Sequence, residues 1–440
     1  MNDLILLNGH CYINGELQKT DIAVSNNKIS EIGDLKNSEA HEVIDLDGQT
    51  VIPGAIDTQV HFREPGNEHK ETIHTGSKSA ALGGITAFFE MPNTSPSTTN
   101  RKELQRKLDI AKETSFTNYA FYIGGTRTNC EDIRECVDTD GLCGVKIFLG
   151  SSTGDLLLTE EDAIYNLFKE IDLPFAIHSE DEAILTKNKN ELPENPTVEL
   201  HSVWRSAEAA LSSTKKITAL ARRAERKIHV LHISTKEEID YLIQQKDICS
   251  FEITPQHLYL SAPDCYEKWG SLAQMNPPIR SKDHQDRLWE AVINDEVDVI
   301  GSDHAPHLLD EKEKPYPESP SGIPGVQTIF PLMLNAHLEG KISIQQLVNY
   351  FCENPVKLFN IQNKGKIEVG KDADFTIFSD KETSLNKSDM GYKCGWTPFH
   401  EKKLKGKVEM TIIGGKVVMR DNKIIVSPSE VPTNPLQFGR

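Results

Sequence analysis

Short apolar segments alternate with amphipathic segments through the middle of the chain, and this alternation is the strongest constraint on the fold. The apolar segments are expected to be strands, at Ala55–His61, Ile85–Glu90, Tyr119–Ile123, Val145–Leu149, Phe175–His178, Ile228–His232, Ser250–Ile253 and Val297–Ser302. Helical periodicity predicts helices between them, among them Lys102–Lys112, Glu160–Glu170, Ser202–Arg223 and Lys236–Gln245. Eight alternating units in about 300 residues are typical of a parallel (β/α)₈ TIM barrel. A doubly wound open sheet is the alternative, but no G-x-G-x-x-G motif follows the first strand.

Both ends of the chain have a different style, with short apolar runs separated by turn residues. Residues 1–50 and 365–426 are each expected to form small antiparallel strands. Neither end alone supplies enough strands for a stable sheet. We therefore predict an α/β protein in two domains. A (β/α)₈ barrel domain spans residues 53–362, and a small composite β-sandwich domain is built from residues 1–52 and 363–440.

Composition excludes several classes of partner. The formal charge is −18, from 48 basic and 66 acidic residues, which argues against nucleic acid and anionic membrane surfaces. No apolar run approaches the roughly 20 residues that cross a bilayer, and the first residues lack the features of a secretory signal. The eight cysteines are scattered, as expected for reduced thiols. We predict a cytosolic protein, with Asp310–Pro320 as a mobile surface loop.

Polar residues recur where the predicted strands end, which is the active-site face of a barrel. The candidate metal ligands are His61, Lys146, His178, His232 and Asp303. One strand-end histidine alone is more often a structural residue, but agreement among several strands favours a metal site. Imidazole and carboxylate ligands suit zinc, which activates water for hydrolysis. A cationic Lys146 would repel the metal, so it fits only if neutralised, for instance as a carbamate that bridges two metal ions.

Several motifs occur in a fixed order along the barrel. They are Asp57–Gly66 (DTQVHFREPG), Met91–Thr94, Ala176–Glu180, Leu231–Thr235, Thr254–Leu258, Met275–Arg280 (MNPPIR), Gly301–His307 (GSDHAPH) and Ser321–Gly325. In this order they resemble the amidohydrolase superfamily and, within it, the dihydroorotase family. The FREPG and NPPIR segments are the most specific of them. The resemblance implies reversible, zinc-dependent cyclisation of N-carbamoyl-L-aspartate to dihydroorotate in pyrimidine synthesis.

The same resemblance implies a role for each site residue. His61 and Asp303 would hold one zinc ion, His178 and His232 the second, and carboxylated Lys146 would bridge them. Asp303 would also be the catalytic residue that moves a proton between water and the ring nitrogen. The substrate's carboxylate would be bound by Arg63, Asn93 and His307. Its ring amides would contact Asn276 and the backbone near Gly325. A homodimer is expected by analogy.

Gln59 departs from the family pattern, in which the first strand reads Asp-x-His-x-His. Three interpretations follow. Gln59 ligates weakly or only lines a two-zinc site, or one metal is lost and a single zinc remains, or the chain is a non-catalytic partner subunit of a carbamoyltransferase. We favour the first, and the third is disfavoured because every other expected ligand and substrate residue is present. An allantoinase or dihydropyrimidinase that acts on a neighbouring cyclic amide is a further alternative.

Overall fold

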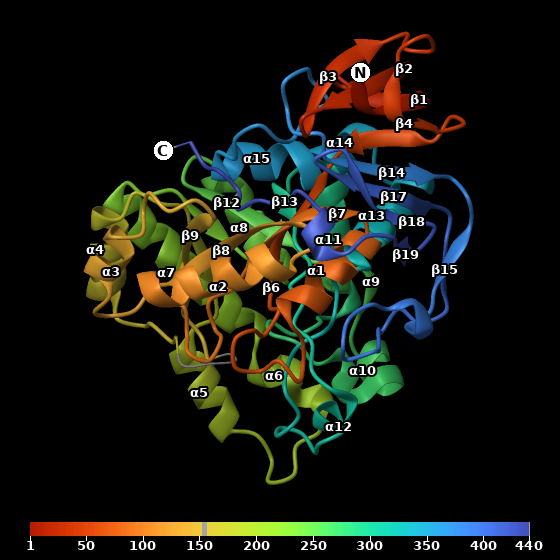
Figure 1. The fold of residues 1–440 in the computed structure, drawn as a ribbon. Coiled ribbons are helices and arrows are strands. Elements are labelled where there is room, and N and C mark those ends of the chain that lie inside the picture. Colours follow the sequence, from red (N-terminus) through yellow and green to blue (C-terminus); the bar gives the residue numbers. More distant parts are fainter. Residues whose placement is uncertain (152–155, 440) are drawn as a thin grey trace.

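The computed structural model describes residues 1–151 and 156–439. Its centre is a ring of parallel strands surrounded by helices, and a second sheet lies against one side (Figure 1). None of the helices within the described part of the chain is long and apolar enough to cross a membrane. The predicted α/β class and the barrel are confirmed.

The ring is an eight-stranded sheet in which each strand pairs with its neighbour in the sequence. Its strands are β6 (Ala55–Val60), β7 (Ile85–Glu90), β8 (Asn118–Gly124), β9 (Leu142–Phe148), β10 (Phe175–His178), β11 (Ile228–Val230), β12 (Cys249–Ile253) and β13 (Val299–Ile300). All residues of β6 to β11 are buried, as expected where helices cover a parallel sheet. The ring closes through a bridge between Val60 and His304, where His61 N donates to His304 O at 2.7 Å.

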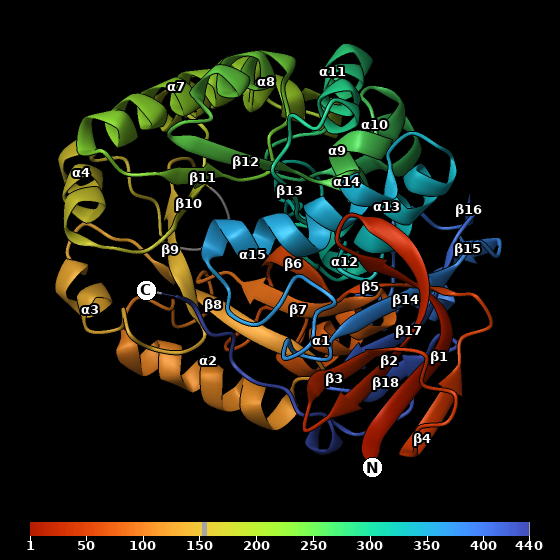
Figure 2. The same ribbon diagram turned by 90° about the horizontal axis from the view of Figure 1, so that it is seen from above.

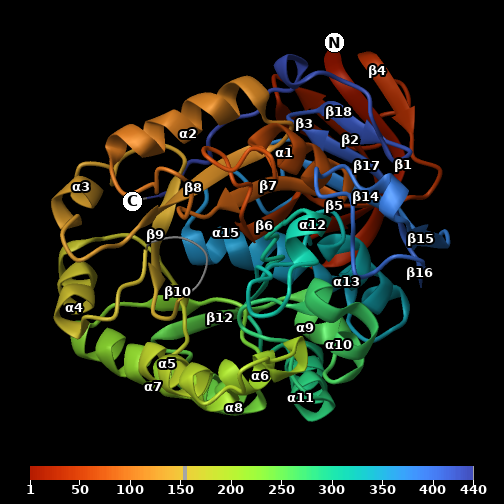
Figure 3. The ribbon, with the colours of Figure 1, turned by 90° about the horizontal axis from the view of Figure 1, so that it is seen from below.

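Helices follow most of the strands and surround the ring (Figure 2). They are α1 (Ile73–Leu82), α2 (Arg101–Thr114), α3 (Cys130–Arg134), α4 (Glu161–Glu170), α5 (Glu182–Asn190), α6 (His201–Trp204), α7 (Ala207–Ala224), α8 (Lys236–Leu242), α9 (Pro255–Tyr259), α10 (Asp264–Trp269), α11 (Lys282–Ile293), α12 (Leu309–Lys312), α13 (Ile329–Leu338), α14 (Ile344–Val348) and α15 (Asn354–Phe359). Side-chain caps start several of them; at α2, Asn100 Oδ1 accepts from Glu103 N at 3.1 Å. Figure 2 shows α15 lying across one end of the ring. The opposite end, seen in Figure 3, is where the loops that follow the strands gather.

Two elements of the barrel differ from the prediction. The single helix expected over Ser202–Arg223 is broken between α6 and α7, because Arg205 leaves helical geometry (φ −94°, ψ 70°) and Ser206 caps a new helix. The last strand, expected over Val297–Ser302, is shorter. Beyond its end, Ser302 N donates to a side chain, Asp57 Oδ1 at 3.0 Å, and not to the backbone of a neighbouring strand.

The two ends of the chain meet in one nine-stranded sheet (Figure 1). It contains β1 (Asn2–Ile13), β2 (Glu16–Ser25), β3 (Lys28–Gly33), β4 (Ala40–Asp45), β5 (Thr50–Pro53), β14 (Phe375–Ser379), β17 (Lys407–Ile413), β18 (Lys416–Arg420) and β19 (Lys423–Ile424); β15 (Thr383–Leu385) and β16 (Lys402–Leu404) form a separate hairpin. Residues from both ends share one apolar core, with Leu6 and Val24 from the first part packed beside Phe375 and Ile412 from the second. The domain boundaries themselves stay a prediction.

The terminal strands are not all antiparallel, which differs from the prediction for residues 1–50. After the β2–β3 hairpin the chain crosses to the other side of β1, so β4 and β5 pair with β1 in parallel. The Asp310–Pro320 segment also differs from a plain surface loop. It contains most of α12. Lys312 is only 1% exposed, and its buried ammonium donates to the carbonyls of Gln274, Pro320 and Gly322.

Candidate active site

A cavity opens inside the ring at the end where the strands terminate. Its lining includes most of the predicted site residues: His61, Arg63, Asn93, Lys146, His178, His232, Asn276 and Asp303. Gln59 also lines it, together with Phe148, Ala305, Ser321 and Gly322. Two predicted substrate residues lie outside the lining. Gly325 N donates to His304 Nδ1 at 3.0 Å, and His307 lies behind Arg63.

His61 and Asp303 form the first pair of predicted ligands. His61 Nε2 lies 3.2 Å from Asp303 Oδ1, and His61 Nδ1 lies 2.8 Å from Asn93 Oδ1. Nδ1 can donate to this amide oxygen, and Nε2 is the nitrogen that a metal shared with Asp303 would take. Gln59 Nε2 donates to the same Asp303 oxygen at 3.0 Å. Burial lowers the pKa of His61, although Asp303 opposes this, so the imidazole is held in the neutral form that binds metal.

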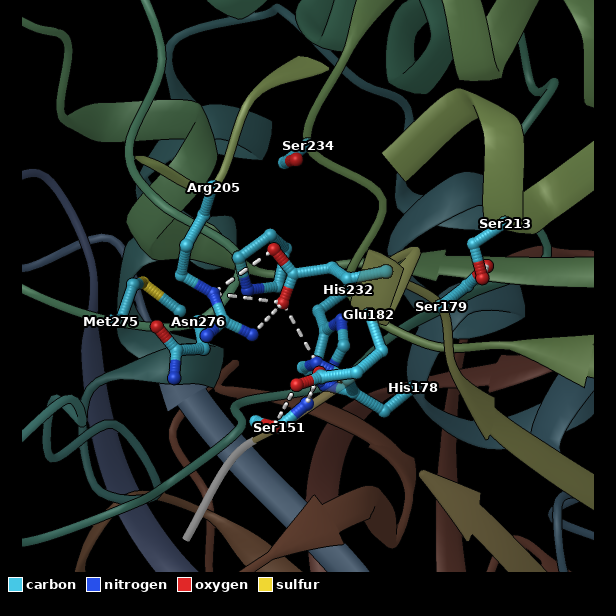
Figure 4. Close-up of polar contacts among 12 residues, drawn as sticks. Ser151, His178, Ser179, Glu182, Arg205, Ser213, His232, Ser234, Met275 and Asn276 are labelled. Atoms are coloured by element: carbon cyan, nitrogen blue, oxygen red, sulfur yellow. Dashed lines mark hydrogen bonds and ion pairs between the residues drawn. The ribbon is translucent and has the colours of Figure 1, made fainter. Parts of the chain in front are cut away.

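His178 and His232 form the second pair, with His178 Nδ1 3.1 Å from His232 Nε2 (Figure 4). The other nitrogen of His178, Nε2, lies 2.8 Å from Glu180 Oε2. Burial lowers the pKa of both histidines, and the His178 ring together with Lys146 lowers that of His232 further. These two nitrogens share a hydrogen bond in the structure, and a metal bound between the two neutral rings would take their lone pairs in its place.

Lys146 lines the same cavity as both pairs, and its charge contributes to the lowered pKa of His61, His178 and His232. It is 1% exposed. Among the described residues its Nζ has no hydrogen-bond partner. Burial lowers its pKa to about 7, even though Asp303 and Glu252 favour the charged form. An amine with this pKa is largely neutral in weakly alkaline solution, and a neutral amine is the form that reacts with carbon dioxide.

The donor set fits a metal, although the side chains alone do not assemble into one cluster. In the part of the chain that the structure describes, no three His, Cys, Asp or Glu side chains come together closely enough to hold an ion. The donors stand instead as two pairs near an unpartnered lysine. A carboxylated Lys146 would supply the oxygens that the two pairs lack.

Arg63 carries a buried positive charge at the rim of this site. It is 4% exposed, and its Nε donates to Pro306 O at 3.3 Å. Its Nη2 lies 3.2 Å from His307 Nε2. His307 Nε2 donates to Ser321 O, and its Nδ1 accepts from Lys70 Nζ, each at 3.1 Å. His307 thus supports a cationic wall that includes Arg63 and Lys70.

Three site residues have left-handed backbone conformations, which are rare for residues other than glycine. They are Arg63 (φ 66°), His232 (φ 39°) and Asp303 (φ 43°). Each follows a barrel strand closely, where the chain turns inward. Such strain persists where the surrounding structure enforces it, and it is concentrated at functional sites.

Sequence reasoning missed several residues that support the site. Glu180 could have been found, because a histidine ligand usually has a carboxylate or carbonyl partner on its second nitrogen. Arg205, which binds Glu180, gave no signal because it comes from a later helix break. Lys107 of α2 is fully buried, where its Nζ bonds Glu90 and donates to Met91 O at 2.8 Å. It anchors the segment that leads to Asn93.

Known proteins resemble this chain over nearly its whole length. The model of the amidohydrolase family matches residues 50–418. The chain belongs to the amidohydrolase family. Curated family members include a dihydroorotase from Pyrococcus furiosus, which is 36% identical over 96% of this chain and 94% of its own length. Another is the dihydroorotase from Methanosarcina acetivorans, 34% identical over 97% of this chain and 94% of its own.

Among solved amidohydrolase-like structures, an L-hydantoinase (dihydropyrimidinase) from Arthrobacter aurescens superposes with a TM-score of 0.91. It is 28% identical, and the match covers 97% of this chain and 98% of that one. The predicted resemblance to dihydroorotases is confirmed. Together, the family and these relatives indicate a hydrolase that acts on cyclic amides, in a family whose members use a metal such as zinc.

Proposed function

We propose that this amidohydrolase is a dihydroorotase, which interconverts dihydroorotate and N-carbamoyl-L-aspartate. Water opens the cyclic amide in one direction, and the reverse step closes the ring. The observation that carries the proposal is Arg63, a buried cation lining the same cavity as the predicted metal ligands. A hydantoin or dihydrouracil ring has no carboxylate to pair with it. Identities of 34–36% to dihydroorotases over nearly the whole chain support the same choice.

Binding and proton transfer are assigned to the chain's own residues. The Arg63 guanidinium would pair with the substrate's carboxylate, with Asn93 beside it and His307 holding Arg63 from outside the cavity lining. Fixing that group places the ring amide over the two ligand pairs. Asn276 would bind the ring amide from the other side. Asp303 would take the proton from water and pass it to the ring nitrogen.

Zinc would be held by His61 and Asp303 on one side and by His178 and His232 on the other, with carboxylated Lys146 between. When bound, zinc polarises a carbonyl and makes water a nucleophile near neutral pH. Two zinc ions are expected if Gln59 is a ligand or only lines the site. One zinc ion is expected if a metal is lost because Gln59 stands in place of the family's histidine. A homodimer and a cytosolic location stay predictions.

The test compares dihydroorotate with 5,6-dihydrouracil, which is the same ring without the carboxylate, and with hydantoin and allantoin. Purified protein is assayed after incubation with zinc and bicarbonate. Dihydroorotate should have the highest kcat/KM by at least tenfold. Faster opening of one of the uncharged rings would instead identify a dihydropyrimidinase, hydantoinase or allantoinase. Zinc-loaded protein that opens none of the rings would support the non-catalytic subunit.

A further inference from the structure

His178 is held by a fully buried carboxylate outside the predicted ligand set. Glu180 is 0% exposed, and its Oε2 accepts from His178 Nε2 at 2.8 Å. A carboxylate that accepts this bond fixes the proton on Nε2. The lone pair of His178 is then on Nδ1, which accepts from His232 Nε2 at 3.1 Å.

Glu180 is in turn held by Arg205. Arg205 Nε donates to Glu180 Oε1 at 3.1 Å and to Oε2 at 3.0 Å, and Nη2 also bonds Oε2. Arg205 is 2% exposed. Its position comes from the break between α6 and α7, which turns its side chain toward β10.

Arg205 also has a partner behind it. Arg280, in the NPPIR segment, bonds Arg205 O through Nη1 and donates through Nε to Ser234 Oγ at 3.3 Å. Ser234 lies two residues after His232 in the chain. The assembly therefore links the loop after β11 and the NPPIR segment to the histidine at the end of β10.

We infer that Glu180, clamped by Arg205, is a positioning residue that fixes the tautomer and ring orientation of His178, so that Nδ1 faces His232 and the metal. The inference rests on the proposed zinc site, although its geometric part does not depend on which ring is hydrolysed. A neutral amide at position 180 can accept from Nε2–H or donate to an unprotonated Nε2. It would therefore no longer choose between the tautomers. Loss of such partners typically weakens metal affinity 10- to 100-fold.

The test uses the full chain with Glu180→Gln, Arg205→Lys and a control, Glu409→Gln. Glu409 is also a buried carboxylate paired with a cation, since Lys407 Nζ lies 2.6 Å from its Oε2. It belongs to the terminal sheet. Zinc affinity is measured by competition with a chromophoric chelator. The tautomer of His178 in zinc-free protein is read from ¹⁵N chemical shifts of labelled histidine, and the resonance is assigned with His178→Asn.

Wild-type, zinc-free protein should carry the His178 proton on Nε2, and Glu180→Gln should show a mixture of tautomers with 10- to 100-fold weaker zinc binding. Arg205→Lys keeps the charge but loses the paired hydrogen bonds of the guanidinium, so its zinc affinity should lie between those of wild type and Glu180→Gln. Glu409→Gln should match wild type. A wild-type proton on Nδ1 would overturn the inference, whether or not the variants fold. Unchanged zinc affinity in folded Glu180→Gln would do the same. Normal tautomer and zinc results without dihydroorotate turnover would contradict only the proposed function.

Discussion

Gln59 stands where the family pattern has a histidine, and its contacts define what that exchange does. Its Nε2 donates a hydrogen bond to Asp303 Oδ1 at 3.0 Å. Its Oε1 is buried and has no hydrogen-bond partner among the described residues. A buried acceptor left unpaired costs about 1–3 kcal/mol, so this oxygen is suited to a cation. An amide oxygen is nevertheless a weaker zinc ligand than imidazole.

The Gln59→His variant should bind zinc more tightly and in greater amount per chain than wild type, because imidazole replaces the amide. Zinc content is measured by atomic absorption after dialysis against a fixed free-zinc concentration. Gln59→Leu, which has no donor, is the matched control and should hold no more zinc than wild type. Equal zinc content in all three proteins would remove Gln59 from the metal site.

Arg63 is the residue on which substrate choice depends. Hydrogen bonds to charged groups contribute about 1.5–3 kcal/mol, so Arg63→Ala should raise the KM for dihydroorotate roughly 10- to 150-fold. Arg63→Lys should give a smaller increase, since an ammonium cannot grip a carboxylate bidentately. Initial-rate kinetics measure both. Arg127→Ala, at a side chain that is 74% exposed, serves as control, and an unchanged KM in Arg63→Ala would refute the assigned role.

At the scale of elements, α2 (Arg101–Thr114) is fastened to the end of β7 by the buried pair of Lys107 and Glu90. Removing one partner of a buried pair leaves an uncompensated charge. Lys107→Met should therefore lower the free energy of unfolding by about 3–5 kcal/mol. The exposed α11 pair of Lys282 and Asp286 supplies the control, because Lys282→Met should cost no more than about 1 kcal/mol. Urea unfolding measures both, and equal losses would contradict the argument.

Glu238 in the first turn of α8 predicts a pH dependence. Burial raises its pKa to about 7, although hydrogen bonds from Thr235 and Thr214 oppose this. The folded state thus keeps a proton that the unfolded chain releases near its ordinary value of 4.5. Stability due to this group is present below pH 4.5 and is lost as pH rises to 7. The Glu238→Gln variant has no carboxyl group to ionise, so it does not lose this stability as the pH rises.

Relative to wild type, Glu238→Gln should gain up to roughly 3 kcal/mol in free energy of unfolding between pH 5 and pH 8. The measurement is a series of urea titrations across that range. A difference between the two proteins that does not change with pH would show that Glu238 is ionised throughout.

For the whole molecule, the segment around Leu436 ties the end of the described chain to the barrel. Leu436 is 1% exposed and packs with Phe359 and Tyr122. Its backbone N donates to Tyr119 O at 2.9 Å, and its O accepts from Gly141 N at 2.9 Å. This contact joins the segment to the starts of β8 and β9, at the end of the ring opposite the candidate site.

Leu436→Ala should lower the free energy of unfolding by about 2–5 kcal/mol, through lost burial and the cavity left behind. Leu309→Ala, at a leucine that is 44% exposed, should change it by less than about 0.5 kcal/mol. Both variants are unfolded with denaturant, and their midpoints are compared with that of wild type when the dependence of the unfolding free energy on denaturant concentration is the same. Similar effects would mean that the Leu436 segment contributes little to the barrel.

The sequence by itself determined the kinds of element, their order and most of the candidate site. Strand and helix periodicities are local properties, so the bounds of β7 and β10 are predictable to the residue. Parallel strands bring their ends to one face, which is why His61, Lys146, His178, His232 and Asp303 can be grouped from the sequence alone. Only tertiary structure decided the parallel pairing of β1 with β4, the burial of Lys312 and the break at Arg205. It also decided which nitrogen of His178 is free, because the bonds among His178, Glu180 and Arg205 join segments that local periodicity does not relate.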